Sequence, residues 1–421
     1  MPQINFFANT AFLGRYGARE LAVSGVAGLF YLILSMVGYG LASGVQVVMA
    51  RRAGEGKTDD LSRTFTNGAF LSLFISLCLM VLCLWMAPIL FGLFLQNGEH
   101  ALMSINFLYL RVWGLPFLML TQLFNAFFIV IGKTRYLMVS SLAAAVVNIL
   151  LDYLFIFGRW GFPEMGLEGA ALASILAEVV ALLVVLGFFY YKKIHAKFPV
   201  RAHLELDLPL IRRMGKVALP LVVQYFFSIG GWQLFFIYVE HLGEAPLAAS
   251  QMLRSIMGMI GISTWAFAIT CNMMVSNIIG QGQARQVVPL IKKVCTVSFG
   301  ITLGICLVLW VSGPHLLAFY RDDAALVQLA LPSLHVILIS ALIMSIATTV
   351  FNGVVGTGNT WVNLGMEVFC VCCYIAYCTV VIANMRLSLT WAWMSEFVYW
   401  TTLLVVATGY LFSYRWRGKK I

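Results

Sequence analysis

The chain has 421 residues, of which 61% are apolar and 10% charged, and its mean hydropathy is +0.92. Soluble domains carry roughly 25% charged residues, so this composition excludes a soluble globular fold. The formal net charge of +10 would suit a nucleic-acid partner, but the placement of the basic residues accounts for it without one.

Apolar segments follow one another along the chain, and each complete one reaches the roughly 20 residues needed to cross a bilayer. The first, at 1–14, would cover only about 21 Å at 1.5 Å per residue, short of a hydrocarbon core of about 30 Å. Either this helix is truncated or the start is misassigned, and we favour a misassigned start. The other predicted spans are 21–50, 65–95, 101–132, 136–158, 166–191, 208–240, 245–280, 287–313, 325–357, 361–383 and 388–414.

The basic residues separate by alternate loops. One side holds twenty of the 27 Lys and Arg residues, and the other holds only Arg15, Arg19, Arg159, Arg321 and Arg386. Such a bias orients membrane proteins with the basic side in the cytoplasm. We therefore expect a multi-pass protein of the bacterial inner membrane with both termini cytoplasmic.

Three glycine-bearing turns repeat at an offset of 226 positions, which indicates two copies of one unit. Each copy holds six spans, an even number, so the two copies enter the membrane from the same side. The expected fold is an all-α polytopic membrane protein with twelve transmembrane helices. These would form two six-helix bundles related by a pseudo-twofold axis along the membrane normal. The matching pairs are Gly17 with Gly243, Gly54–Gly56 with Gly280–Gly282, and Gly132–Thr134 with Gly358–Thr360.

The same pattern gives the domain boundaries. We expect an N-terminal bundle over 1–191, a cytoplasmic linker and interfacial segment over 192–216, and a C-terminal bundle over 217–421. Two bundles that face each other could open a central cleft to either side of the membrane by rocking.

Several of these segments resemble the multidrug and toxic compound extrusion (MATE) transporters. Asn9–Gly17 resembles the D-T-x-x-x-G-x-x-G ending of that family's first helix, with Asn9 in place of the usual Asp. The resemblance extends in register over the whole chain and is greatest to the bacterial branch named after the DNA-damage-inducible F protein. The other segments that resemble the family are Ala50–Gly56, Gly132–Thr134, Gly358–Thr360, Asn148–Tyr153 and Gly166–Ser174.

The resemblance implies cation-coupled export of organic, often cationic, molecules, with H⁺ or Na⁺ as the coupling ion and no cofactor. In that branch an Asp on helix 1, an Asn and an Asp on helix 5, and a hydroxyl on helix 6 form a cation site. Carried over to this chain, these residues are Asn9, Asn148, Asp152 and Ser174.

Helix geometry supports the same grouping. Counted from the outer helix ends, Asn9, Asp152 and Ser174 lie at nearly one depth, about 8–12 Å from those ends. Asn148 and Asp152 share a helix face, and Glu178 lies one turn deeper than Ser174. An acid inside a membrane is a functional candidate, although Asp152 could also brace two helices, and Glu178 suits helix packing as well as proton handling. A lone carboxylate compensates Na⁺ less well than two, which favours H⁺.

The second bundle offers Glu367 and Glu396, for which we expect a structural role. Another branch of the family has acids on helices 7 and 10, where this chain has Ser228 and the neighbourhood of Ile346. The sequence therefore argues against cation coupling through the second bundle.

Two arginines lie inside spans, and both could extend to the interface on their long side chains. Arg111 could instead pair with Glu178 or a substrate anion, and Arg254 is the better candidate for a cleft residue. Aromatic rings suit flat amphiphilic cations through cation–π contact. The predicted substrate-cleft residues are Tyr31, Tyr39, Gln251, Arg254 and Trp265.

These features predict an antiporter that works as a monomer on small organic, amphiphilic cationic substrates. A lipid-linked precursor flippase of the same superfamily is the nearest alternative, but it should have a more cationic cleft and further helices. A membrane enzyme would need a His/Asp or metal cluster at one face, and the six histidines are scattered. We therefore expect no enzymatic activity, catalytic residues or metal site.

Overall fold

The computed structural model describes residues 9, 12–94, 98–199, 204–320 and 324–417. Over these residues the chain is helical and has no strand. Among the described residues, ten helical segments are long and apolar enough to cross a membrane, with 98–130 counted as one segment, and all ten coincide with predicted spans. The last predicted span is α14 (Leu389–Phe412). Most of the predicted first span, 1–14, lies outside the described residues.

The chain packs as two compact units. The first comprises residues 1–49 and 57–218, and the second comprises 50–56 and 219–421. The predicted linker boundaries at 192–216 stay a prediction. The first unit contains α2 (Ala18–Gly54) as far as residue 49, and the last turn of that helix belongs to the second unit. It also contains α3 (Thr58–Phe94), α4 (Gly98–Arg111), η1 (Val112–Gly114), α5 (Leu115–Val130), α6 (Arg135–Phe157), α7 (Gly166–Tyr191) and α8 (Ile194–Lys197). The second contains most of α9 (Leu208–Glu240), with α10 (Glu244–Gly280), η3 (Ala284–Gln286), α11 (Val287–Tyr320), α12 (Ala324–Gly356), α13 (Thr360–Cys378), η4 (Thr379–Asn384) and α14.

The predicted internal repeat is present in the backbone. Helices α2 and α10 each have 37 residues, and their bounds differ by the predicted offset. The turn after each helix has a glycine in the left-handed region, Gly56 with φ 72° and Gly282 with φ 78°. The next matched pair, Gly132 and Gly358, has φ values of 71° and 85°. The two halves therefore share one local geometry at these two pairs of turns, whereas at the first matched pair only Gly243, with φ 116°, has a positive φ.

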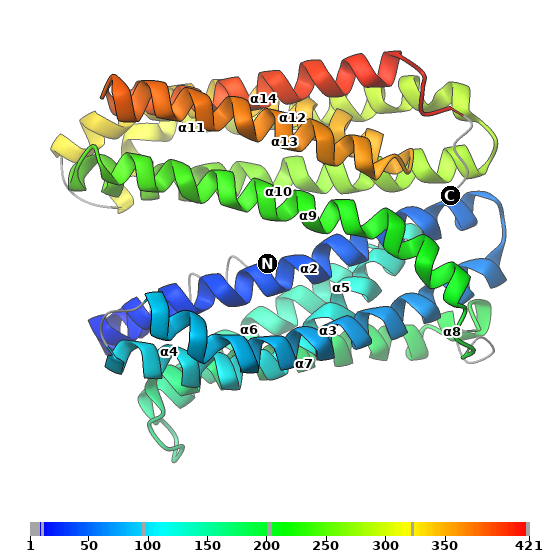
Figure 1. The fold of residues 1–421 in the computed structure, drawn as a ribbon, viewed down its shortest axis with the longest axis horizontal. Coiled ribbons are helices and arrows are strands. Elements are labelled where there is room, and N and C mark those ends of the chain that lie inside the picture. Colours follow the sequence, from blue (N-terminus) through cyan, green and yellow to red (C-terminus); the bar gives the residue numbers. More distant parts are fainter. Residues whose placement is uncertain (1–8, 10–11, 95–97, 200–203, 321–323, 418–421) are drawn as a thin grey trace. The chain divides into compact units, whose positions relative to one another are not determined.

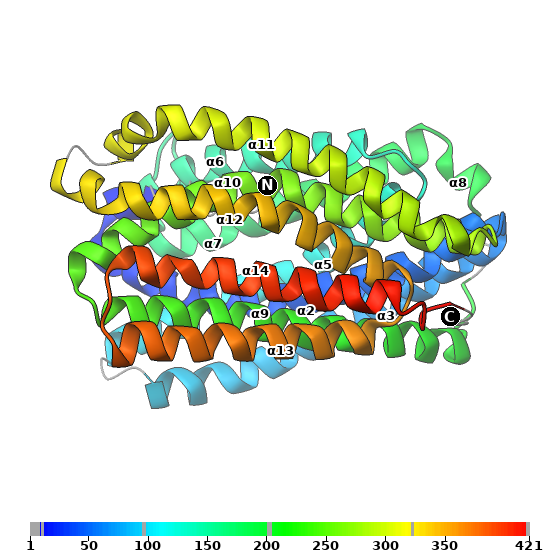
Figure 2. The same ribbon diagram turned by 90° about the horizontal axis from the view of Figure 1, so that it is seen from above.

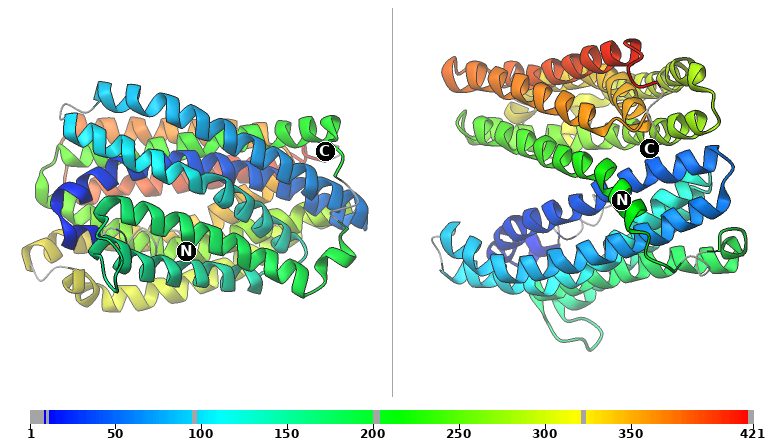
Figure 3. Two further views of the ribbon diagram at one scale, coloured as in Figure 1. Left: turned by 90° about the horizontal axis from the view of Figure 1, so that it is seen from below. Right: turned by 45° about the vertical axis from the view of Figure 1, so that its right-hand side comes forward.

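In the first unit, α6 packs along α7, and α3 packs along α5. Phenylalanines fill the space between α3, α5 and α7, where Phe65 lies 4.7 Å from Phe127 and 6.4 Å from Phe189, measured between ring centroids. The helices run lengthwise beside one another (Figure 3). This apolar packing fixes α6 and α7, which carry most of the candidate site.

In the second unit, α12 packs against α10, α11 and α14, and α13 packs against α14. These helices run along the long direction of the unit (Figure 1), and α14 lies between α12 and α13 in the view from above (Figure 2). Most of the side chains that α12 buries are apolar, including Leu334, Ile337 and Met344. The core of this unit is thus built around α12.

Two predicted spans contain local irregularities. The span predicted at 101–132 is divided by the 3₁₀ turn η1, and Pro116 follows at the start of α5. Proline lacks an N–H and suits the first turn of a new helix. The span predicted at 361–383 ends in the π-helical turn η4; such turns are often found at functional sites.

Candidate functional site

Asp152 and Asn148 lie one turn apart on α6, and both side chains are completely buried. Because α6 packs along α7, these two polar groups are held inside the first unit and away from lipid. The shared face that the sequence predicted is therefore an inward face.

Asn9 and Ser174 are in direct contact. The Asn9 Nδ2 donates a hydrogen bond to the Ser174 Oγ over 3.0 Å. Ser174 is buried on α7, so this bond joins the N-terminal segment to the helix that packs against α6. The structure thus brings together two of the predicted cation-site residues from distant parts of the sequence.

Glu178, one turn along α7 from Ser174, is held by Arg111. The guanidinium donates from Nη1 to Oε2 over 2.9 Å and from Nη2 to Oε1 over 2.5 Å. Tyr31 of α2 donates its hydroxyl to the same carboxylate over 3.1 Å. The Arg111 guanidinium also lies 3.7 Å from the centroid of the Tyr31 ring. Both charged side chains are nearly buried, at 12% and 13% exposed.

This arrangement decides between the two interpretations of Arg111, extension to the membrane interface and pairing inside the protein. The side chain turns inward and pairs with Glu178, and it does not extend to the membrane surface. Bidentate arginine–carboxylate pairs of this kind are strong and directional. The Arg111 charge also acts on Asp152. The first unit therefore contains a buried cation of its own beside its two candidate acids.

The predicted cleft residues are found in different surroundings. Tyr31 is buried, at 7% exposed, and takes part in the Glu178 cluster. In the second unit, Trp265 is 43% exposed on α10, and the Arg254 guanidinium lies 5.1 Å from the centroid of the Phe236 ring. Gln251 is exposed and Tyr39 is half-buried. Their role in substrate binding stays a prediction.

The acids of the second unit have partners that the sequence did not indicate. Glu367 of α13 accepts hydrogen bonds from Ser228 of α9 and Tyr399 of α14. Glu396 of α14 accepts a bond from the Trp400 Nε1 over 2.9 Å. Spacing along one helix could have suggested the Glu396–Trp400 contact, which joins residues four apart. It could not have shown that α13 faces Ser228.

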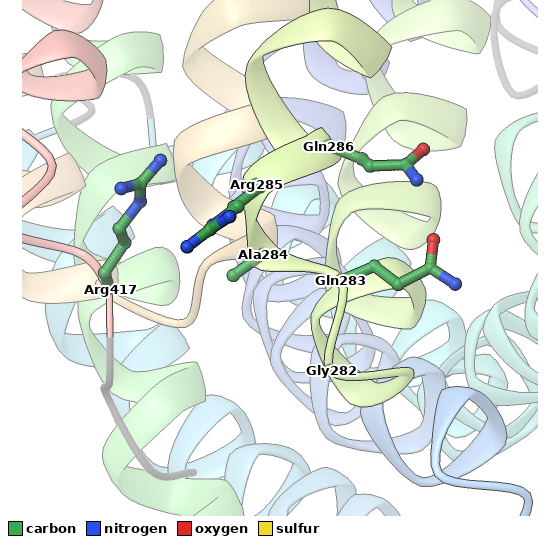
Figure 4. Close-up of a pocket in the computed structure, with 6 residues that line it drawn as sticks. All are labelled: Gly282, Gln283, Ala284, Arg285, Gln286 and Arg417. Carbon is green, nitrogen blue, oxygen red and sulfur yellow. The ribbon is translucent and has the colours of Figure 1, made fainter.

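A surface pocket of the second unit is lined by Gly282–Gln286 and Arg417. The side chains of Arg285 and Arg417 extend toward the same space, and those of Gln283 and Gln286 point the other way (Figure 4). The described residues that line this pocket include no acid and no predicted cation-site residue.

Comparisons with known proteins agree with this architecture. The MatE family model matches residues 3–154 and 220–380. A protein of Thermotoga maritima described as "Probable multidrug resistance protein NorM" is 24% identical over 357 residues, covering 84% of this chain and 76% of the relative.

Solved structures show the same fold. One, described as the outward-facing conformation of a multidrug resistance MATE family transporter of the MOP superfamily, superposes with a TM-score of 0.88. It is 15% identical, and the match covers 98% of this chain and 93% of that one. A MOP superfamily transporter from Pyrococcus furiosus, described as having a binding pocket of reverse polarity, gives a TM-score of 0.84 at 17% identity, with 99% and 92% coverage.

The family model covers most of the chain in two blocks, one in each half, as the internal repeat requires. The apolar helices, the duplicated turns and the family match together show that this chain belongs to the MatE family of multidrug and toxic compound extrusion transporters.

Proposed function

We propose that the chain is an antiporter that exports organic, amphiphilic cationic compounds by alternating access and is driven by an inward flow of protons. The observation that carries the proposal is the complete burial of Asp152 on a membrane-spanning helix, beside Asn148. A buried carboxylate in a membrane is costly unless it is neutralised. Binding and release of a cation at Asp152 would therefore change the packing of α6 against α7.

Glu178 is less suited to that role. Arg111 already neutralises it through two hydrogen bonds, so the charge of this pair stays the same during a cycle. We assign Glu178 and Arg111 to the positioning of Tyr31 and the electrostatics around Asp152. Asn9 contributes an amide where a second carboxylate would favour Na⁺, and the single acid suits H⁺.

The family relationship supports export of small organic molecules, and the Thermotoga relative is described as a probable multidrug resistance protein. We place the protein in the bacterial inner membrane as a monomer, with both termini cytoplasmic. This orientation follows from the bias of basic residues toward one set of loops.

The test uses inverted membrane vesicles and a fluorescent cationic dye. With the unmodified protein, we expect an imposed pH gradient to drive dye uptake into the vesicles and a Na⁺ gradient alone to drive little. Asp152→Asn should abolish gradient-driven uptake, because the amide cannot bind and release a proton. Glu168→Gln is the matched control, since it makes the same change at an exposed position of α7. Full proton-driven uptake by Asp152→Asn, at equal amounts in the membrane, would contradict the proposal.

A second variant tests the charge count at this site. Asn9→Asp restores a second carboxylate opposite Ser174, which the Asn9 amide contacts at 3.0 Å. Two carboxylates compensate Na⁺ better than one, so we expect Na⁺-driven uptake to rise in this variant. Transport under a Na⁺ gradient is compared with the unmodified protein at constant pH. An unchanged Na⁺ response would show that position 9 does not set the preference between the ions.

A further inference from the structure

Two acids are buried in the second unit, in a region to which the sequence assigned no role in ion binding. Glu367 on α13 is 1% exposed and Glu396 on α14 is 3% exposed. Helix α13 lies within a candidate membrane span, and α14 packs against it. An ionised carboxylate in such a place is strongly unfavourable unless a counter-charge or a proton neutralises it.

The groups around Glu367 are neutral hydrogen-bonding partners. Its Oε1 accepts a bond from the Ser228 hydroxyl and another from the Tyr399 hydroxyl, the latter over 2.7 Å. The Cys370 thiol, one turn along α13, also lies close enough for electrostatic interaction. Hydroxyl groups can accept as well as donate, so they accommodate a carboxyl group with or without its proton.

The surroundings of Glu396 are of the same kind. Its Oε2 accepts from the Trp400 Nε1, and its Oε1 accepts from the Tyr374 hydroxyl over 3.4 Å. The Cys378 thiol is the other titratable neighbour on α13. The indole N–H is a donor only, so it fixes Oε2 as an acceptor and leaves Oε1 as the oxygen that can carry a proton.

The two acids belong to one cluster. The ring centroids of Tyr374, which contacts Glu396, and Tyr399, which contacts Glu367, are 5.8 Å apart. Both acids act electrostatically on Tyr399. The charge on Glu396 therefore acts on Tyr399, one of the groups that hold Glu367.

The charges on neighbouring helices lie elsewhere. On α12, His335 stacks on Trp310 with ring centroids 4.1 Å apart. On α10, Arg254 lies over Phe236. Among the residues that the structure describes, no Lys, Arg or His forms an ion pair with Glu367 or Glu396, in contrast to Glu178 in the first unit.

We propose that Glu367 and Glu396 form a second proton-binding site, in the C-terminal unit, which binds protons and excludes metal cations. The Trp400 N–H points its positive end at Glu396, which disfavours a metal ion on that oxygen, and neutral donors give a carboxylate no counter-charge. Protonation allows α13 and α14 to stay packed, and proton release favours their separation. This site is independent of Asp152 and holds whether or not Asp152 couples transport.

Infrared spectroscopy of the full-length protein in a lipid bilayer tests the site directly, through the C=O stretching band of protonated carboxyl groups. The Asp152→Asn variant is the reference, so that Asp152 does not contribute to the band. We expect a band that shifts in D₂O, disappears at high pH, and loses intensity in steps when Glu367→Gln and Glu396→Gln are added. Glu168→Gln, at an exposed position, should leave it unchanged.

Two results would overturn the proposal. One is a band that neither glutamine substitution reduces, because both acids would then be ionised. The other is a band that disappears on addition of Na⁺ at constant pH, because the site would then bind a metal cation. If the glutamine variants do not fold, Ser228→Ala and Tyr399→Phe serve instead. Each removes one donor to Glu367 and should shift the frequency of its band, and unshifted frequencies in both would equally refute the site.

Discussion

Replacing Arg111 by methionine is expected to lower the free energy of unfolding by about 3–5 kcal/mol, because Glu178 would keep a buried charge without its partner. Methionine retains much of the apolar volume of the side chain, so the loss of unfolding free energy measures the effect of removing the charge. Glu178→Met should cost a similar amount, since it leaves the guanidinium buried alone. Chemical unfolding in mixed micelles, followed by tryptophan fluorescence, measures both variants.

The double variant Arg111→Met/Glu178→Met separates the ion pair from the packing. An apolar pair of similar volume often replaces a buried ion pair at little net cost, so we expect the double variant to recover most of the lost stability. Tyr31→Phe removes one donor to the carboxylate and should cost less, about 1.5–3 kcal/mol. Arg19→Met is the control, because its ion pair with Glu99 is exposed, at 41% and 73%, and such pairs contribute only about 0–1 kcal/mol. Strictly additive losses in the double variant would show that Arg111 and Glu178 do not stabilise each other.

The same pair has a consequence for transport. With Glu178→Gln, the positive charge of Arg111 would have Asp152 as the remaining acid within its electrostatic reach. The guanidinium would then compete with the coupling proton, so this substitution should weaken gradient-driven transport even where the protein stays folded.

The membrane spans follow from the sequence with little error, because long apolar stretches with few charges have no other stable location. Helices α6 and α7 begin or end within one residue of their predicted bounds. The polar ends are less well predicted: α3 begins at Thr58, seven residues before the apolar stretch does. Hydropathy marks the part of a helix within the hydrocarbon, and α3 continues beyond it.

Which neighbouring helix a side chain faces was harder to predict than how deep the residue lies in the membrane. The family resemblance grouped Asn9 with Ser174, helix depth supported the grouping, and the two are in contact. Depth left the partner of Arg111 open, because an arginine side chain is long enough to reach either the interface or a neighbouring helix. The Ser228–Glu367 contact was missed for a similar reason. The family resemblance places a second acid on the helix that carries Ile346, whereas in this chain the acid near Ser228 comes from α13.

The second large effect is expected where the last turn of α2 crosses the last turn of α10, inside the second unit. A Cβ on Gly54 would lie 1.9 Å from the carbonyl oxygen of Asn277, and a Cβ on Gly280 would lie 2.2 Å from that of Arg51. Adding 226 to the numbers of the α2 residues gives those of the α10 residues, so the two repeats contact each other here through equivalent positions. The Asn277 side chain also donates to the Ala50 carbonyl. Backbone atoms cannot move aside as a flexible side chain can.

Gly54→Ala and Gly280→Ala should therefore each destabilise the protein by about 1–3 kcal/mol, the range typical of overpacking. This loss is expected although alanine is the better helix former by about 1 kcal/mol in a helix interior. Gly28→Ala in α2 and Gly258→Ala in α10 are the matched controls, because a Cβ at either position meets nothing within 4 Å. These controls should be neutral or stabilising in the same unfolding assay. Gly54 and Gly280 end their helices, where helix propensity counts less than at the interior positions 28 and 258. Stability lost at the first pair therefore measures the close approach of the last turns of α2 and α10. If all four variants had equal stability, the two helix ends would not be in backbone contact.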